Sequence, residues 1–528
     1  TTVFEKTIKL LKAEIKHVDQ KRQIENPESR VVLESSIKSA QLDTYCYSHP
    51  GINCGDTLRF LVKFWEINSS VSRWSFQQTA GVGQTEIEGL ESMFLWEDGQ
   101  GEFYEFVQSL DGRLGGSWHR GQGAWNRRGV SISRMRDLHS NYYFGSIFDQ
   151  SIAVIIPNKE EHLPAITCFI FSPEYREEVR RLNPSLAVST SVLAEVPFDL
   201  EYWTKFSEEK YPNGLPKPYS GDPTQWIFHG HPAQSEESLQ VAVARLLGYQ
   251  WPAESDAEME LSDQARDWIS LCASLSAFVD DDGIVCLSPV RGEKSADERL
   301  ESLLMAAFGE QWNASLRNNL LEQANCKGKT LDFWLREKFF EQHCKLFQNR
   351  PFIWQIWDGL KDGFAVLVNY HQLNRQNLER LIYTYLGDWI KFQEYGVKEG
   401  IDGAILRLQA AQTLKTHLEN ILEGETPYDI FVRWKSLEEQ SIGWNPDIND
   451  GVRMNIRPFM SAPDVGKKDA GILRTKPNIK WSKDRGKDVA SAPWYKLGLE
   501  YGESEGSRIN DHHLSLVQKQ AERDKNKC

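Results

Sequence analysis

The sequence contains no Cys-x-x-Cys pair, no Pro-Pro dipeptide and no apolar run of the roughly 18 residues that a membrane-spanning helix needs. We therefore expect no membrane partner. Zinc ribbons and thiol redox sites need closely spaced cysteines, whereas the eight cysteines here are scattered. Scattered cysteines, together with a charged rather than apolar start of the chain, indicate the reducing cytoplasm.

Two catalytic motifs are also missing: the GxxxxGK[ST] phosphate loop and the HExxH zinc motif. We therefore expect no catalytic residue in this chain. His229 and His231 lie close together, but no nearby Cys, Asp or Glu supplies the further ligands of a metal site. We expect ordinary loop histidines there and at His512 and His513, and no metal.

The net charge of −14, from 61 Lys and Arg against 75 Asp and Glu, weighs against a nucleic-acid partner. The segment from Gly112 to Arg136 departs from this average, because it combines glycines, two tryptophans and six arginines with no acidic residue. Arginine binds phosphate and guanine through paired hydrogen bonds, and glycines allow a backbone to approach a DNA groove. We therefore predict contact with double-stranded DNA, with a solvated surface loop as the alternative. The predicted contact residues are Arg113, Arg120, Arg127, Arg128, Arg134, Arg136, Trp118 and Trp125.

A second basic stretch runs from Lys467 to Lys487, where eight basic residues face only Asp469 and Asp484. Phosphate contacts in this stretch would make DNA binding depend strongly on salt. The residues predicted to bind DNA here are Lys480, Lys483, Arg485 and Lys487.

The spacing of apolar residues predicts an α+β fold. Strands are expected at 151–157 and 166–171, followed by a charged helix that starts at Pro173. A β-hairpin is expected at 350–371, because two aromatic and β-branched runs flank Asp-Gly pairs that favour turns. We expect Trp354 and Trp357 of this hairpin to pack in the core rather than to clamp a ligand.

An antiparallel pair of helices should follow the hairpin. Asn374 is a suitable N-cap for the first helix, whose apolar face includes Trp389 and Phe392. The second helix should span 403–423 and end at Gly424.

Four other segments carry weaker signals. Residues 1–24 place Phe4, Ile8, Leu11, Ile15 and Val18 at the spacing of a helix that packs on another helix. We expect same-chain packing, with a partner protein as the alternative. Residues 205–235 combine prolines with aromatics, which predicts an ordered strap. The acidic run 254–263 should be a solvated surface, and 445–528 is polar with weak periodicity.

The stretch from Gly51 to Glu66 carries the pattern G-x-x-[TC]-G-D-x-x-R-F followed by W-E. It resembles a segment of large adenine-specific DNA methyltransferases of type IIG restriction–modification and phage-defence systems. In that family the segment lies after the catalytic domain, at the start of target recognition. The stretches 211–232, 350–371 and 443–459 also resemble this region, so the resemblance covers nearly the whole chain after its N-terminal segment.

The resemblance implies a restriction–modification or phage-defence role and a partner, either a catalytic domain or a separate subunit, that methylates adenine N6. S-adenosylmethionine is the cofactor of the full enzyme, but this chain has no FxGxG-like loop and no [DN]PP[YF] motif, so we expect no cofactor in it. Gly55, Asp56 and Arg59 form the Gly-Asp motif of the resembling segment. Asp56 and Arg59 could be structural or functional.

With the resemblance, the sequence suggests a mixed α/β target-recognition domain, a helical scaffold domain and a polar basic C-terminal segment. The expected boundaries are 1–47 for the N-terminal helix, 48–204 for target recognition, 205–235 for the strap, 236–349 for a mainly helical domain, 350–442 for the hairpin with its helical pair, and 443–528 for the basic segment.

Two other classes of function remain open. The 18 tryptophans and many acids would also suit a carbohydrate-binding module, which should have exposed Trp platforms and a carboxylate pair. The acidic surface and the N-terminal helix would suit a non-catalytic interaction scaffold, which should have no salt-dependent affinity for DNA.

Overall fold

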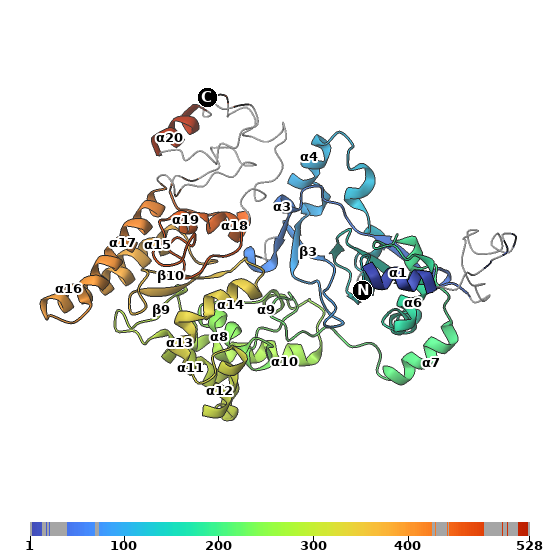
Figure 1. Ribbon diagram of the computed structural model, residues 1–528, viewed down its shortest axis with the longest axis horizontal. Coiled ribbons are helices and arrows are strands. Elements are labelled where there is room, and N and C mark those ends of the chain that lie inside the picture. The colour runs from blue at the N-terminus through green and yellow to red at the C-terminus, as the bar shows by residue number, and fades with distance from the viewer. Residues whose placement is uncertain are drawn as a thin grey trace. The chain divides into compact units, whose positions relative to one another are not determined.

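The computed structural model describes residues 3–12, 17, 19, 21, 40–68, 73–424, 428, 441, 443–479, 499, 504 and 516–525 (Figure 1). The predicted α+β fold is confirmed, because these residues form many helices and several small sheets. Within the same residues, no helix is both long and apolar enough to cross a membrane.

The chain forms two compact units whose segments alternate along the sequence. The first unit comprises Thr1–Ile52, Ala80–Glu88 and His119–Pro216, and the second comprises Asn53–Thr79, Gly89–Trp118 and Lys217–Cys528. The segment 48–204, expected to be one contiguous domain, is therefore divided between them. Long-range pairing within the second unit explains the division. The indole nitrogen of Trp65 donates to the carbonyl of Arg350 at 2.9 Å, and the amide of Trp226 donates to the carbonyl of Leu90 at 3.0 Å.

An antiparallel sheet with the strand order β1-β8-β5-β6 lies at the centre of the first unit. Its strands are β1 (Cys46–Pro50), β8 (Ile152–Pro157), β5 (Gly129–Ser133) and β6 (Ser140–Tyr143). The strand predicted at 151–157 is confirmed as β8. Successive side chains point to opposite faces. Val130 and Ile155 belong to a cluster with the helices, whereas Val154 and Ile156 belong to a second cluster on the other face.

Three helices accompany this sheet: α5 (Leu163–Ile170), α6 (Pro173–Leu182) and α7 (Leu200–Lys210). The strand predicted at 166–171 is wrong, because this run lies in α5. Every residue of α5 except Pro164 is buried, so the helix is apolar all round and its sequence has no period that distinguishes it from a strand. The helix predicted from Pro173 is confirmed as α6, and the Ser172 hydroxyl accepts a hydrogen bond from the Tyr175 amide at 3.2 Å.

Helix α1 (Val3–Lys12) is the described part of the predicted N-terminal helix. Ile8 is 37% exposed and Leu11 is 80% exposed, so at these two positions the expected packing on the same chain is wrong. Ile15 and Val18, the next positions of the predicted seam, lie outside the described residues.

The N-terminal segments of the second unit form a small antiparallel sheet with two helices. The strands β2 (Leu61–Lys63), β4 (Ser92–Leu95) and β3 (Trp74–Gln78) pair in that order, and the helices are α3 (Thr57–Phe60) and α4 (Glu102–Ser109). The ring of Phe60 packs against Phe103 at 5.2 Å and Phe106 at 5.0 Å between centroids, which attaches α4 to α3.

The segment 236–349 is mainly helical, as predicted. Its helices are α8 (Ser238–Leu246), α9 (Pro252–Ser255), α10 (Asp263–Cys272), α11 (Ala296–Phe308), α12 (Ala314–Gln323), α13 (Leu331–Glu337) and α14 (Phe339–Leu346). The strap before them begins only after α7, and its Trp226 and Phe228 are buried, so it is ordered as expected. In the acidic run 254–263, Glu254 differs from the expected solvated surface, because its buried carboxylate pairs with Arg245 at 2.7 Å.

The predicted hairpin is confirmed as β10 (Ile353–Trp357) and β11 (Ala365–Asn369), with β9 (Ile284–Cys286) as a third antiparallel strand. Trp354 and Trp357 are buried, as expected. The helical pair is also confirmed, as α15 (Arg375–Arg380), a π-helical turn (Leu381–Leu386), α16 (Gly387–Lys398) and α17 (Ala404–Glu423). The Asn374 side chain caps α15, and Gly424 ends α17 with φ +71°. The expected inward position of Phe392 is wrong, because this side chain is 60% exposed.

Part of the polar C-terminal segment lies in the core of the second unit. Helices α18 (Gly451–Asn455) and α19 (Arg457–Ser461) bury Val452, Ile456 and Phe459. The Trp357 indole donates to the carbonyl of Leu473 at 3.1 Å. All five residues of α18 are buried, the polar ones included, and α19 buries three residues in a row, so neither short helix has an amphipathic period from which this core could be predicted. Helix α20 (Leu516–Lys525) is the last described element.

Candidate nucleic-acid interface

The predicted DNA-binding segment begins, in the second unit, with a tight turn after α4. Asp111 and Gly112 adopt left-handed backbone angles, with φ +47° and +77°. The amide of Arg113 donates to the carbonyl of Leu110 at 3.0 Å. Arg113 is exposed, and its side chain has no ion pair or hydrogen bond among the described residues. The Arg113 guanidinium is therefore available to a ligand.

The Gly-Asp motif supports this turn. Gly55 has φ +71°, and a β-carbon at this position would lie 3.1 Å from Cδ1 of Leu114. The amide of Asn53 donates to the carbonyl of Ser117 at 3.0 Å, which fixes the far end of the turn. The motif thus packs against the turn that carries Arg113. The sequence did not predict this contact, because the two stretches are far apart in the chain.

Arg59 and Asp56 of the motif have structural surroundings. Arg59 Nη2 lies 2.7 Å from a carboxylate oxygen of Glu102, and its guanidinium lies 4.8 Å from the centre of the Phe60 ring. Glu102 also pairs with Arg73 at 3.2 Å. Asp56 is only 5% exposed and directly precedes α3. Of the two roles that the sequence left open, these contacts favour the structural one.

Trp118 also packs within the second unit. Its ring centroid lies 5.6 Å from that of Tyr104, 6.3 Å from Trp96 and 6.4 Å from Phe103. The side chain is half-buried. Its aromatic surface is therefore engaged mainly with the protein, which leaves little of it for stacking on bases.

The remaining predicted residues of this segment lie in the first unit, and two of them hold loops. Arg127 Nη2 donates to the carbonyl of Pro157 at 3.0 Å, and Arg134 Nε donates to the carbonyl of Val188 at 3.1 Å. Burial lowers the pKa of His49, and the nearby charge of Arg127 lowers it further. Substitution of these arginines would therefore alter the fold as well as any ligand contact.

Arg120 and Arg136 are the arginines of the first unit whose side chains are most available to a ligand. Both are exposed, and neither side chain has an ion pair or hydrogen bond among the described residues. Arg128 is half-buried, and Trp125 packs on the sheet cluster that contains Phe148. The prediction is thus narrowed to Arg120 and Arg136, in addition to Arg113 of the second unit.

The glycines of the segment serve two different purposes. A β-carbon at Gly121 would lie 2.6 Å from the Phe148 ring, one at Gly123 would lie 2.9 Å from the His49 ring, and one at Gly129 would overlap the carbonyl oxygen of Ile155. These three glycines allow close packing within the first unit. Positions Gly112 and Gly115 differ, because nothing lies within 4 Å of a β-carbon built there.

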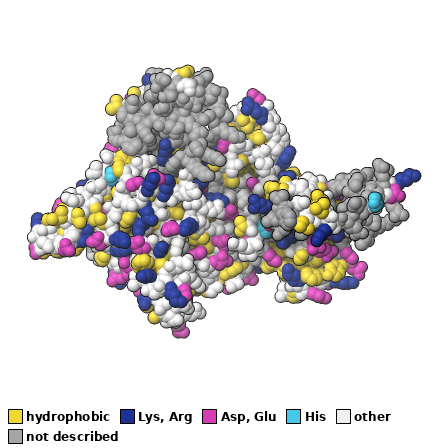
Figure 2. All heavy atoms as spheres, viewed as in Figure 1, with side chains coloured by type: hydrophobic (Ala, Val, Ile, Leu, Met, Phe, Trp, Pro, Cys, Tyr) yellow, Lys and Arg dark blue, Asp and Glu magenta, His cyan; other side chains and the backbone are white. Residues whose placement is uncertain are grey.

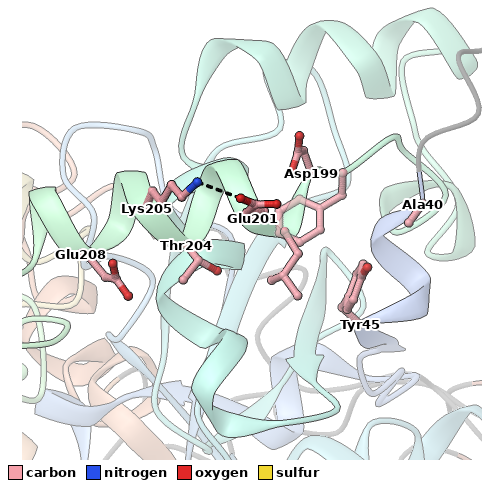
Figure 3. Close-up of a pocket in the computed structure, with 9 residues that line it drawn as sticks. Ala40, Tyr45, Asp199, Glu201, Thr204, Lys205 and Glu208 are labelled. Carbon is pink, nitrogen blue, oxygen red and sulfur yellow. Dashed lines mark hydrogen bonds and ion pairs between the residues drawn. The ribbon is translucent and has the colours of Figure 1, made fainter.

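Two negatively charged regions do not belong to this interface. Figure 3 shows a pocket of about 730 Å³ along α7, where Asp199, Glu201 and Glu208 would repel phosphate. Its one lysine, Lys205, pairs with Glu201 at 2.7 Å. Lys and Arg side chains are interspersed with Asp and Glu on the face drawn in Figure 2, so on this face DNA would be contacted by individual arginines rather than by a continuous basic surface.

The second negatively charged region is the acidic group Asp280, Asp281 and Asp282, whose carboxylate oxygens lie within 4.8 Å of one another. Asp280 pairs with Arg299 at 2.8 Å, and Asp282 pairs with Arg380 at 2.9 Å. These pairs neutralise two of the carboxylates, so the group joins helices rather than forming a metal site.

His229 and His231 also have protein partners. The ring Nδ1 of His229 accepts the amide of His231 at 3.1 Å, and that of His231 accepts the amide of Ala233 at 3.3 Å. Burial lowers the pKa of both rings to about 4. They are neutral loop histidines, as expected.

The four residues predicted in the second basic stretch, Lys480, Lys483, Arg485 and Lys487, lie outside the described residues, as do His512 and His513. The site that can be described therefore consists of exposed arginines with supporting packing. No protein-family model and no curated protein matches this chain.

Proposed function

We propose that this chain is the DNA-recognition part of a SAM-dependent adenine-N6 DNA methyltransferase of a restriction–modification or phage-defence system. Its role would be to position double-stranded DNA for a catalytic domain or subunit that this sequence does not contain. The resemblance of Gly51–Glu66 and the later stretches supports the family. The observation that carries the DNA contact is the exposure of Arg113, Arg120 and Arg136 in a segment with no acidic residue.

The division of labour follows from the chemistry of the reaction. Methylation of adenine requires the base to leave the helix and enter a pocket that holds it, and S-adenosylmethionine would be bound beside that pocket. The residues of this chain would bind the surrounding duplex. Contacts to phosphates set the register of the protein on DNA, and contacts to base edges specify the sequence.

A cytoplasmic location is part of the proposal, because the substrate is intracellular DNA. The seven described cysteines are free thiols, which is typical of a reducing compartment.

A titration with a fluorescent duplex at two salt concentrations tests the proposal. We compare the unchanged chain with Arg120→Ala/Arg136→Ala, which removes two exposed guanidiniums of one unit. Each lost phosphate contact should reduce the slope of log K against log[salt] by about 0.9, so the double variant should lose about 1.8. Arg181→Ala is the matched control, because Arg181 is exposed in the same unit but pairs with Glu178 at 2.9 Å.

Binding that does not respond to salt, or an equal loss in the Arg181 control, would contradict the proposal. A chain that binds no duplex, even together with a methyltransferase catalytic subunit, would also contradict it. Activity on DNA is then measured as transfer of labelled methyl groups by that subunit with and without this chain.

An interaction scaffold is the second candidate, and one observation favours it. Large apolar side chains on α16 and α17 are exposed by half or more, namely Phe392, Tyr395, Ile405 and Leu406. Hydrophobic atoms gather over the end of these helices in Figure 2. Exposed aromatic clusters of this kind mark protein interfaces. A scaffold without DNA affinity would show no salt slope in the titration above.

A further inference from the structure

We propose that the Arg113 turn inserts into the minor groove of DNA and that Arg113 senses the width of the groove there. This inference rests on the proposed function and specifies how one part of it would work. The turn comprises Asp111–Gly116 and follows α4, which is labelled near the top of Figure 1, above α3.

The shape of the turn suits a narrow groove. All of its residues except the half-buried Leu114 are exposed. Gly112 and Gly115 have no side chain, and nothing lies within 4 Å of a β-carbon built at either position. The minor groove of B-DNA is about 6 Å wide, whereas a helix with side chains is about 10–12 Å across and needs the major groove. A bare turn with one long side chain therefore fits the narrower groove.

The turn is held rigidly, which lowers the entropy cost of inserting it. The amide of Gly115 donates to the carbonyl of Gly112 at 2.8 Å, and the hydroxyl of Ser117 donates to the carbonyl of Leu114 at 2.5 Å. Leu114 in turn packs on Gly55. A preorganised turn loses little conformational freedom on binding.

Arg113 is the one basic residue of the turn, and its exposed guanidinium is the group that would reach the floor of the groove. Narrow minor grooves, as in A-tracts, concentrate negative potential at their floor and attract a single arginine. Arginine suits this position better than lysine, because a guanidinium is more weakly hydrated than an ammonium group.

The test compares two duplexes of equal length, one with a central A-tract and one rich in G·C pairs, by fluorescence anisotropy. The unchanged chain should bind the A-tract at least about fivefold more tightly, the lower end of what one sequence-specific contact contributes. Distamycin, a small minor-groove ligand, should compete for the A-tract duplex. Arg113→Lys should keep most of its affinity for the G·C duplex but lose the A-tract preference.

Two further variants separate insertion from folding. Gly112→Asn adds a side chain where no protein atom lies within 4 Å of the β-carbon, and asparagine tolerates the φ of +77° at this position, so the variant should reduce A-tract binding while the circular-dichroism spectrum stays unchanged. Arg317→Ala is the matched control, because Arg317 pairs with Glu301 at 2.8 Å in the same unit and should leave both duplex affinities unchanged.

The outcomes distinguish this inference from the proposed function. Salt-dependent binding that is equal for both duplexes, insensitive to distamycin and unchanged in Arg113→Lys would overturn minor-groove insertion and leave the proposed function standing. A salt slope that falls by about 0.9 in Arg113→Ala, equally on both duplexes, would assign Arg113 to phosphate instead, which also overturns the inference. Absence of binding to either duplex would overturn the proposed function itself.

Discussion

Gly55→Ala tests whether the Gly-Asp motif supports the arginine turn. Gly55 has φ +71°, and an L-residue in the left-handed region costs about 1–2 kcal/mol. The new β-carbon would also lie 3.1 Å from Leu114 Cδ1 and 3.3 Å from Cδ2, so the leucine would have to move by a few tenths of an ångström. We expect the free energy of unfolding of the second unit to fall by about 1–2 kcal/mol, and DNA affinity to fall with it because the turn shifts.

Urea denaturation followed by tryptophan fluorescence measures this loss. With an m-value of about 2 kcal/mol per M, the midpoint should fall by about 0.5–1 M. Repeating Gly55→Ala in a Leu114→Ala background separates the two causes, because the shorter side chain removes the close contact and leaves the backbone strain. The combined loss should be smaller than the sum of the single losses by about 0.5–1 kcal/mol.

Two results would refute this reasoning. An equal cost of Gly55→Ala in both backgrounds would show that Leu114 does not require a glycine at position 55. An unchanged midpoint in Gly55→Ala itself would show that neither the backbone angle nor the contact matters.

Three other predictions concern the stability of the fold. Gly129→Ala should cost more than about 3 kcal/mol and yield insoluble protein in an expression assay, because its β-carbon would overlap the Ile155 carbonyl oxygen inside the central sheet. Burial lowers the pKa of His343 to about 3, so below pH 6.5 this ring takes up a proton in the unfolded chain but not in the folded one. The free energy of unfolding should therefore be highest above pH 6.5 and fall by up to about 1.4 kcal/mol per pH unit as the pH drops towards 3. Urea melts of His343→Gln, whose side chain cannot be protonated, should lack this part of the pH dependence. Arg127→Ala should lower the thermal midpoint because it removes a bond to a strand-end carbonyl, whereas Arg120→Ala should leave it unchanged and reduce only DNA affinity.

Local signals in the sequence predicted much of the fold. The caps at Asn374 and Gly424 depend only on neighbouring residues, so they were recognisable without a structure. The hairpin 350–371 was recognisable for the same reason, because its turn residues lie between its strands. Helix α5 was not, because a run that is buried on every side has the same pattern as a buried strand.

The candidate site was predictable in part. The exposure of Arg113 and Arg120 follows from a polar, glycine-rich segment. The packing roles of Gly121 and Gly129 could not be foreseen, because the atoms they approach belong to Phe148 and Ile155, which only the folded sheet brings close. Even the contacts of Arg127 depend on a strand end thirty residues away.

The alternation of the two units along the chain limits how this protein can be cut or exchanged. A fragment ending at Pro216 would contain β2, β3 and β4 without the rest of the second unit. It would expose Trp65 and Phe76, which pack on Phe347 and Trp226 in the whole chain, and should aggregate. No single cleavage releases either unit intact. Recognition specificity would therefore be altered one side chain at a time rather than by moving a module between proteins.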